Sequence, residues 1–388
     1  MRVLFSSTWG YGHVFPLVPL AQALVASGHA VLWAANEQAG PTVAAAGIDV
    51  VAAGLDNYGV TQARQQMMAG ATGIPPQQRA AHAFPTMFAG SAAPAMARDL
   101  LPIAREWQPD LMVHEPAELA SSLVGAVLGV PSLTQSFGGA VPVPILTAAG
   151  ERLRTMWAGH GLPLPPYAGQ FLAPYLDICP PAVQTVPVDH VDVRQPLRPI
   201  TWTGPAGSPL PTGVTDVDPR PLVYVTLGTV SNASPVLSAA VAGAARTGAR
   251  VLVTVGPDGD PAALGPQPGH VTVERWVDQA TVLTHCSVVV SHAGSGTFLG
   301  ALALGLPQLC LPQAADQFRN TEGVERSGAG IGITPDQMTP EAVGAAVARL
   351  LADDAYRSAA EAVAADIAAM PSPAEVVPVL ERLEHRSG

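Results

Sequence analysis

The chain has 388 residues, and one hydrophobic core rarely extends beyond about 250 to 300 residues, so two domains are expected. Hydrophobic residues make up 48% of the chain and charged residues 13%, a composition that excludes a disordered protein. The net charge of −11, without any run of basic residues, argues against a protein that coats nucleic acid or an anionic membrane. Every basic residue is Arg, so chemistry that requires a Lys Schiff base or the P-loop Lys is excluded.

Cysteine usage and the N-terminal residues bear on the compartment. Cys179, Cys286 and Cys310 are odd in number, far apart and in no C-x-x-C pair, so neither a disulfide framework nor a zinc site is expected. The apolar start MRVLFSS is too short for a signal peptide, and the most apolar segment, 301–312, is interrupted by Pro307. We therefore expect a soluble cytoplasmic protein.

The first part of the chain has the pattern of a parallel α/β domain. A strand over 2–6 is followed by a glycine turn and by an apolar, Ala-rich helix over 15–26. Further strands are expected at 30–34, 48–52, 110–114 and 131–136, and helices at 38–46 and 119–128. The segment 57–88 differs, because Met and Phe are scattered among Gly, Gln and Pro. We expect it to be irregular and mobile and to bind an acceptor through Met67, Phe84 and Phe88.

A segment rich in Pro and Gly divides the chain. It covers 205–220, lacks either periodicity and is typical of a surface linker. After it, strands are expected at 222–226, 251–255, 271–274 and 287–291, helices at 235–245 and 297–304, and a helical tail in at least three pieces from Pro340. The predicted domains are 1–204 and 221–370, with a last helix over 371–388 that packs back on the first. The predicted fold class is α/β, two Rossmann-like doubly wound domains facing a central cleft.

The sharpest local signal is a fully apolar strand that runs into a glycine turn and a small-residue helix. His292, Gly294, Ser295, Gly296 and Thr297 form this turn. Glycines let the backbone approach a ligand closely, and the free N–H groups at a helix start favour an anion. An ordinary turn with Ser295 or Thr297 as helix cap explains the spacing equally well. Because the pattern is G-x-G-x-x-x-G and no acidic ribose partner follows, a dehydrogenase is disfavoured.

Two neighbouring segments are expected to meet this turn at the carboxyl edge of the same sheet. Asp316 and Gln317 follow the next strand, where an acid and an amide suit the hydroxyls of a polyol, although Asp316 would also favour a helix start by itself. Trp276 follows another strand, where its indole could stack on a nucleobase. A buried core Trp is the commoner explanation.

In the first domain, His13 follows the turn after the first strand. A His at this edge of a sheet can act as a general base near neutral pH, although most loop histidines have no such role. The strand DLMVH ends beside Glu115, while Asp110 lies at its opposite end. Among these carboxylates, only Glu115 is expected to reach His13 and orient its ring.

Metal-dependent chemistry finds little support. Two D-x-D sequences are present, but Asp216 and Asp218 lie in the linker, and Asp258 and Asp260 lie within GPDGDP, where every residue is a turn former. No His, Cys and Asp residues have metal-ligand spacing, so neither a metal site nor a cofactor is expected.

Three motifs, in order along the chain, carry a family resemblance. They are GHVFPLVPLAQAL from Gly12, ERWVDQATVLTHCSVVVSHAGSGT from Glu274 and GLPQLCLPQAADQFRN from Gly305. Over nearly the whole chain they resemble the GT-B-fold, family-one glycosyltransferases of actinobacterial natural-product pathways. The resemblance implies an inverting, metal-independent transfer of a deoxysugar from a thymidine diphosphate (dTDP) or UDP donor to a small lipophilic aglycone, polyketide-type or aromatic.

The resemblance also implies roles for individual residues. His13 would deprotonate the acceptor, and Glu115 is the nearest match to an Asp that commonly positions this His in relatives. The implied donor contacts are Thr229 at the phosphates, Trp276 and Val277 at the base, His292 and Gly294 to Thr297 at the diphosphate, and Asp316 and Gln317 on the sugar. No nucleic-acid or membrane partner is implied, and a homodimer is compatible with the sequence.

Two other functions remain open at this point. A GT-B-shaped accessory protein could activate a partner transferase, but it would have no reason to keep His13, Asp316 and Gln317 together. A sugar-nucleotide epimerase could share the fold, but it would not need the apolar Met- and Phe-containing segment for a separate acceptor.

Overall fold

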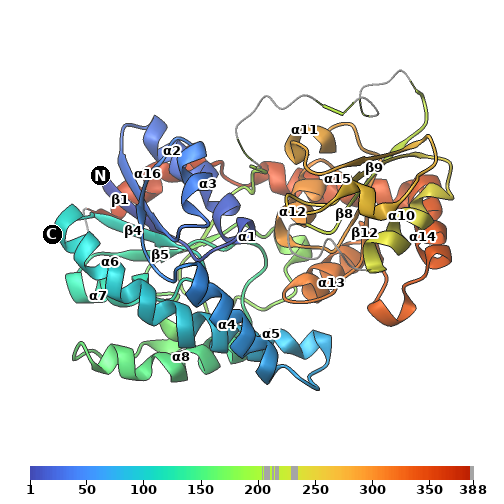
Figure 1. Cartoon of the computed structure of the whole chain (residues 1–388). Coiled ribbons are helices and arrows are strands. Elements are labelled where there is room, and N and C mark those ends of the chain that lie inside the picture. The colour runs from blue at the N-terminus through green and yellow to red at the C-terminus, as the bar shows by residue number, and fades with distance from the viewer. Residues whose placement is uncertain (203, 205–209, 212–213, 215–217, 229–234, 385–388) are drawn as a thin grey trace. The chain divides into compact units, whose positions relative to one another are not determined.

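The computed structural model describes residues 1–388 except 203, 205–209, 212–213, 215–217, 229–234 and 385–388. The chain forms two compact units, each with its own sheet (Figure 1). Unit 1 comprises Met1–Cys179, Val186–Trp202 and Met370–Gly388, and unit 2 comprises Pro180–Thr185 and Thr203–Ala369. Much of the predicted linker, 205–220, lies outside the described residues.

Unit 1 is built on a five-stranded parallel sheet. Its order is β3-β2-β1-β4-β5, with bounds β1 Arg2–Ser6, β2 Ala30–Ala35, β3 Asp49–Ala52, β4 Leu111–His114 and β5 Ser132–Thr134. The crossover and flanking helices are α1 Tyr11–Val14, η1 Phe15–Leu17, α2 Val18–Ala26, α3 Gly40–Ala45, α6 Ala93–Trp107, α7 Ser121–Leu128 and α8 Val143–Ala158. Apolar runs such as that of β1 form central strands because both faces of a parallel sheet are covered. The predicted doubly wound, parallel α/β domain is confirmed, and its strand order is that of a Rossmann-like sheet.

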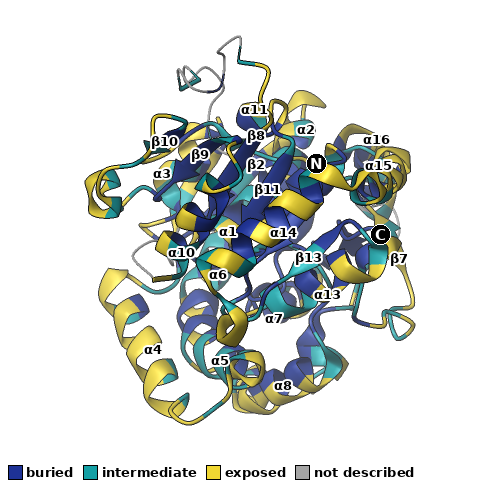
Figure 2. Ribbon diagram, turned by 90° about the vertical axis from the view of Figure 1, so that its right-hand side faces the viewer, coloured by how far each residue is buried: buried dark blue, intermediate teal, exposed yellow. Residues whose placement is uncertain are grey.

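The prediction that 57–88 is irregular is wrong, because this segment is largely helical. It forms α4 Asn57–Gly70, η2 Pro76–Gln78, α5 Arg79–Phe84 and the start of a π-helix, η3 Pro85–Ala92. Asp56 caps α4 by accepting the N–H of Gly59 at 2.7 Å. Most of α4 is exposed (Figure 2), and only Val60 and Ala63 are buried, so its apolar stripe is too narrow to show clearly in the sequence.

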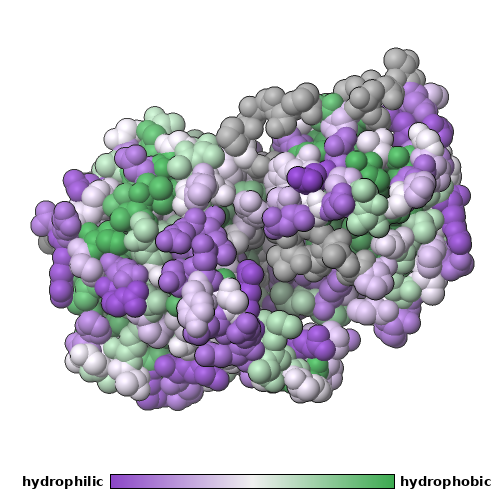
Figure 3. All heavy atoms as spheres, viewed as in Figure 1, coloured by the Kyte–Doolittle hydropathy of each residue, from purple (hydrophilic) through white to green (hydrophobic). Residues whose placement is uncertain are grey.

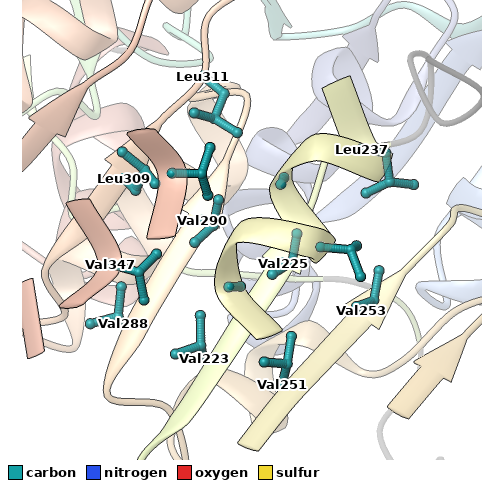
Figure 4. Packing of buried hydrophobic residues seen from close by; sticks show 14 of the residues in the cluster. Val223, Val225, Leu237, Val251, Val253, Val288, Val290, Leu309, Leu311 and Val347 are labelled. Carbon is teal, nitrogen blue, oxygen red and sulfur yellow. The ribbon is translucent and has the colours of Figure 1, made fainter. Parts of the chain in front are cut away.

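Unit 2 is built on a six-stranded parallel sheet of order β10-β9-β8-β11-β12-β13. The strands are β8 Leu222–Thr226, β9 Arg250–Thr254, β10 Val271–Glu274, β11 Val288–Ser291, β12 Gln308–Cys310 and β13 Gly330–Gly332. The helices are α10 Pro235–Ala245, α11 Gln279–Leu283, α12 Ser295–Ala303, α13 Gln317–Ser327, α14 Pro340–Ala352 and α15 Asp354–Ala369, with η5 Pro181–Val183, η6 Pro261–Leu264 and η7 Pro335–Gln337. Valines of β8, β9 and β11 pack beneath α10 and α14 (Figure 4), as their β-branched side chains favour.

The remaining elements complete unit 1. They are η4 Pro166–Gly169, the small parallel pair β6 Tyr175–Asp177 and β7 Arg194–Pro196, and the C-terminal helix α16 Pro373–Glu384. Helix α16 packs on α2, and Glu381 lies 3.1 Å from the Nε2 atom of His29. The tail from Pro340 thus forms the three helices that its sequence predicts.

The stretch Asp354–Leu383 is long and apolar enough to span a membrane by length and composition alone. The chain breaks this stretch into α15 and α16, whose apolar faces are buried in the cores of different units. Helix α15 buries Ala360, Val363 and Ile367, as expected of a core helix. On the face shown in Figure 3, hydrophilic and hydrophobic residues are interspersed over each unit.

Candidate active site

In unit 1 the structure brings His13 and Glu115 together. Because β1 and β4 are parallel neighbours with Ser6 opposite His114, the residues that follow each strand meet at one edge of the sheet. The Nδ1 atom of His13 lies 3.2 Å from Oε1 of Glu115. The His13 side chain is 23% exposed, whereas that of Glu115 is fully buried. This arrangement leaves a reachable imidazole backed by a carboxylate that water does not touch.

Backbone and side-chain donors hold the Glu115 carboxylate in place. Oε1 accepts the N–H of Thr8 at 3.1 Å and its Oγ1–H at 2.8 Å, and Oε2 accepts the N–H of Ala117 at 2.6 Å. Burial on its own would raise the pKa of Glu115. The opposing effect of His13 and of these donors is larger, so the pKa lies below its ordinary value and the group remains a carboxylate.

Aromatic side chains flank the imidazole of His13. Its ring centroid lies 5.4 Å from that of Phe88 on η3 and 5.3 Å from that of Phe137, which meets it edge-on. Phe88 is also 5.2 Å from Phe84, and both belong to the buried cluster that η3 and α8 form. Met67 is half-buried on α4. Phe88 thus borders the candidate base directly, while Phe84 supports it from the core.

In unit 2 the glycine turn encloses His292. A Cβ atom on Gly228 would lie 2.6 Å from the His292 ring, and one on Gly294 would lie 2.4 Å from it, so both positions require Gly. The Nδ1 atom of His292 is buried and has no hydrogen-bond partner within the part of the chain that the structure describes. Burial lowers the pKa of His292 to about 4, partly offset by Asp316, so the imidazole is neutral at pH 7.

A hydrogen-bond network fixes the turn to the following strand and helix. The Oγ of Ser295 donates to Oδ2 of Asp316 at 2.6 Å, and Asn320 Nδ2 donates to the same oxygen at 3.1 Å and to the carbonyl of Ala293 at 2.9 Å. Ala293 and Ala315 have φ angles of 61° and 53°, a left-handed conformation that costs a non-glycine residue energy. Such strain persists where the surrounding structure enforces it, which is common at ligand sites.

The alternative in which Ser295 or Thr297 caps α12 is wrong. The cap residue is Gly294, no side chain in the described part of the chain caps the helix, and the Ser295 hydroxyl is directed to Asp316 instead. Thr297 accepts a hydrogen bond from Nε2 of Gln279 at 3.0 Å. The first N–H groups of α12 therefore have no side-chain cap and remain suited to an anion.

The other predicted donor residues lie around the same edge. Trp276 is 40% exposed after β10, whereas the side chain of Val277 is buried, so only the backbone of Val277 is available to a base. The amide oxygen of Gln317 accepts the N–H groups of Gln313 and Ala314 at 2.7 and 2.9 Å. It therefore shapes the loop before α13 and leaves only its amide nitrogen for a sugar. Thr229 lies outside the described residues.

Sequence reasoning missed several residues of both sites. Thr8, Phe137 and Gly228 act through distant partners in the chain, and no local spacing marks them. Asn320 had a usable signal, because it lies one helical turn after Asp316 on the same helix face.

In the second D-x-D sequence Asp258 lies in a turn and Asp260 caps η6, and in the first Asp218 pairs with Arg220. Asp216 lies outside the described residues. Within the described ranges no three His, Cys, Asp or Glu side chains cluster as a metal site.

Comparisons with known proteins place the chain in a family. The N-terminal domain of the erythromycin biosynthesis protein CIII-like family matches residues 22–209, and its C-terminal domain matches 239–383. L-demethylnoviosyl transferase of Streptomyces niveus is 33% identical over 383 residues, which cover 97% of this chain and 96% of the relative. Elloramycin glycosyltransferase ElmGT of Streptomyces olivaceus is 33% identical over 395 residues, with the same coverage.

The fold of this chain is similar to solved glycosyltransferase structures over nearly its whole length. The glycosyltransferase SsfS6 of Streptomyces sp. SF2575, in complex with thymidine diphosphate, has a TM-score of 0.83 at 29% identity and covers 98% of this chain and 99% of its own. Spinosyn rhamnosyltransferase SpnG, in complex with spinosyn aglycone, has a TM-score of 0.82 at 29% identity, and the match covers 98% of this chain and 100% of SpnG. These neighbours confirm the GT-B fold class. The chain is a glycosyltransferase of the antibiotic-biosynthesis type and belongs to the erythromycin biosynthesis protein CIII-like family.

Proposed function

We propose that this glycosyltransferase moves a deoxysugar from a thymidine diphosphate (TDP) sugar donor to a lipophilic natural-product acceptor. The transfer inverts the anomeric carbon, and His13 is the general base. The observation that carries the proposal is the His13–Glu115 pair, a partly exposed imidazole 3.2 Å from a buried carboxylate. A carboxylate at Nδ1 keeps the proton on that nitrogen and leaves Nε2 free to accept one.

The reaction follows from these groups. Nε2 of His13 takes the proton of the acceptor hydroxyl, whose oxygen attacks the anomeric carbon from the face opposite the diphosphate. The bond from the anomeric carbon to the diphosphate oxygen breaks, and the nucleoside diphosphate leaves with its electron pair. Glu115 stabilises the imidazolium that forms, because its pKa lies below the ordinary value and it stays charged.

The donor half of the proposal rests on the glycine turn of unit 2. The uncapped start of α12, beside His292 and the glycines, suits a diphosphate, and the exposed indole of Trp276 suits a base. Asp316 and the amide nitrogen of Gln317 would bind the sugar. Because SsfS6 and SpnG were solved with thymidine diphosphate, we favour that nucleotide, with UDP as the second choice.

The acceptor half rests on the aromatic side chains next to His13. Phe88 and Phe137 present ring surfaces to the imidazole, and flat apolar surfaces suit a lipophilic aglycone. Met67 on α4 would make a peripheral contact with the same acceptor. SpnG was solved with spinosyn aglycone, which fits an acceptor of this class.

We propose further that catalysis needs no metal and that the enzyme works in the cytoplasm. The N–H groups at the start of α12 and a hydrogen bond from the neutral His292 would stabilise the leaving diphosphate in place of a cation. The three cysteines, far apart and in no C-x-x-C pair, support the location, because they suggest no disulfide framework.

The test is the His13→Ala variant, assayed with the TDP-sugar and an alcohol acceptor. Turnover should fall by roughly 10² to 10⁴, the usual contribution of a positioned base, while TDP affinity stays unchanged. The acid side of the wild-type pH profile should disappear with the imidazole. Full turnover with an unchanged acid limb would refute the role of His13. Purified enzyme that transfers only with a partner protein present would favour the accessory function, and isomerised donor without acceptor would favour the epimerase.

A further inference from the structure

We propose that Thr8 is a positioning residue of the catalytic pair: it fixes the Glu115 carboxylate and sets the pH range in which His13 is a neutral base. This inference rests on the proposed role of His13. Nothing in the sequence motifs marks Thr8, and its importance is visible only in the structure.

The geometry of Thr8 follows from the sheet. Thr8 lies two residues beyond β1, and Glu115 follows β4 directly, so the parallel register of these strands sets them side by side. Both the N–H and the Oγ1–H of Thr8 point to one carboxylate oxygen, Oε1, at 3.1 and 2.8 Å. The same oxygen faces Nδ1 of His13 at 3.2 Å. Thr8 and His13 therefore both face the same carboxylate oxygen.

Because both residues face Oε1 of Glu115, the hydrogen bonds of Thr8 affect how strongly this oxygen attracts the proton on His13. Each donor draws negative charge toward itself, so an oxygen that already accepts two bonds from Thr8 attracts the proton on His13 less strongly. Removing the hydroxyl leaves the backbone N–H in place but concentrates charge on Oε1. The imidazolium is then stabilised, and His13 should lose its proton only at higher pH.

The other titratable groups near the pair have partners of their own. The Glu118 carboxylate accepts bonds from the Ser6 hydroxyl and from the N–H groups of Ala120 and Ser121. The His114 ring lies 3.2 to 3.3 Å from the hydroxyls of Thr134 and Ser122, and the Tyr11 ring packs on Phe15. Among charged groups, His13 is the one that lowers the pKa of the Glu115 carboxylate.

The site tolerates a change at Thr8. Its side chain is 4% exposed and borders a small cavity of about 10 Å³, also lined by Trp9, Asn36 and Met96. Valine has nearly the shape of threonine, so Thr8→Val removes the O–H donor without opening a larger hole. Thr8→Ser keeps the donor and removes only a methyl group.

The experiment measures the protonation of His13 directly and through the reaction. Imidazole NMR titration of the full chain, with His13→Ala used to assign the signal, is combined with the pH profile of turnover on an alcohol acceptor. For Thr8→Val both midpoints should move up by about half to one pH unit, because one pH unit corresponds to about 1.4 kcal/mol and one charge-assisted bond is lost. Thr8→Ser should stay at the wild-type midpoint. Thr134→Val, which removes a hydroxyl beside His114, is the matched control and should not move the His13 midpoint.

The outcomes separate this inference from the proposed function. Unchanged midpoints in Thr8→Val, or the same shift in Thr134→Val, would overturn the role of Thr8. If Thr8→Val does not fold, Thr8→Ala gives the same test. If His13→Ala retains full turnover, the proposed base is wrong, whereas the NMR midpoint of the Thr8 variants still decides whether Thr8 tunes the pair.

Discussion

His13 and His292 both follow the carboxyl end of a parallel strand, but their electrostatic surroundings are opposite. His13 lies beside a buried carboxylate, which favours the imidazolium that forms when it accepts a proton. His292 lies between glycines with a pKa of about 4, so it meets the donor as a neutral hydrogen-bonding group. The same side chain thus suits base catalysis in one unit and phosphate binding in the other.

His292→Gln should weaken the binding of TDP about tenfold, because one hydrogen bond to a charged group contributes about 1.5 kcal/mol or more. Binding of thymidine, which lacks the diphosphate, should change little. Isothermal titration of both ligands at pH 7 measures the difference. If thymidine and TDP lose the same affinity, His292 has a structural role only.

At the scale of elements, the two glycines at the start of α12, Gly294 and Gly296, should differ in how much they matter for stability. A Cβ atom on Gly294 would clash with His292 at 2.4 Å, whereas no atom of the described residues lies within 4 Å of one on Gly296, a residue inside the helix. Gly294→Ala should therefore destabilise unit 2, while Gly296→Ala should stabilise it by about 0.5 to 1 kcal/mol through helix propensity. Denaturant unfolding without ligand measures both variants. Equal losses of stability would contradict the enclosure of His292 by Gly294.

The sequence predicts elements well where burial dominates their pattern. The apolar runs of β8 and β11 could be read as strands because both faces of a parallel sheet are covered. Helix α4 could not, since it buries little more than Val60 and Ala63. The network of Asn320, Asp316 and Ser295 joins residues about 20 positions apart, so spacing suggests its members but only the fold gives its geometry.

At the scale of the whole molecule, the described donor residues all belong to unit 2. TDP at about 100 times its dissociation constant should raise the free energy of unfolding of that unit by about 2.7 kcal/mol. The gain should survive EDTA, because helix N–H groups rather than a cation are proposed to hold the diphosphate. Thermal unfolding with TDP, with and without EDTA, measures it. Loss of the shift in EDTA would contradict metal-independent binding.

In mild acid, Asp177 in unit 1 and His292 in unit 2 should change the stability of their units in opposite directions. In unit 1, burial raises the pKa of Asp177 to about 6, so between pH 6 and about 4 the folded state binds more protons than the unfolded chain and gains stability as the pH falls. In unit 2, the pKa of His292 is lowered from 6.5 to about 4, so over that range the unfolded chain binds more protons and stability is lost.

Comparing each variant with the wild type at pH 7 and pH 5 isolates these two groups from the other titrating residues. Asp177→Asn removes the gain, so its stability relative to the wild type should fall on acidification. His292→Gln removes the loss, so its relative stability should rise, by about 2 kcal/mol between pH 7 and pH 5. Equilibrium unfolding of the wild type and of each variant in urea, at both pH values, measures the two changes separately. Relative stabilities that do not change with pH, or that change with the same sign, would show that these burial effects do not control the acid response.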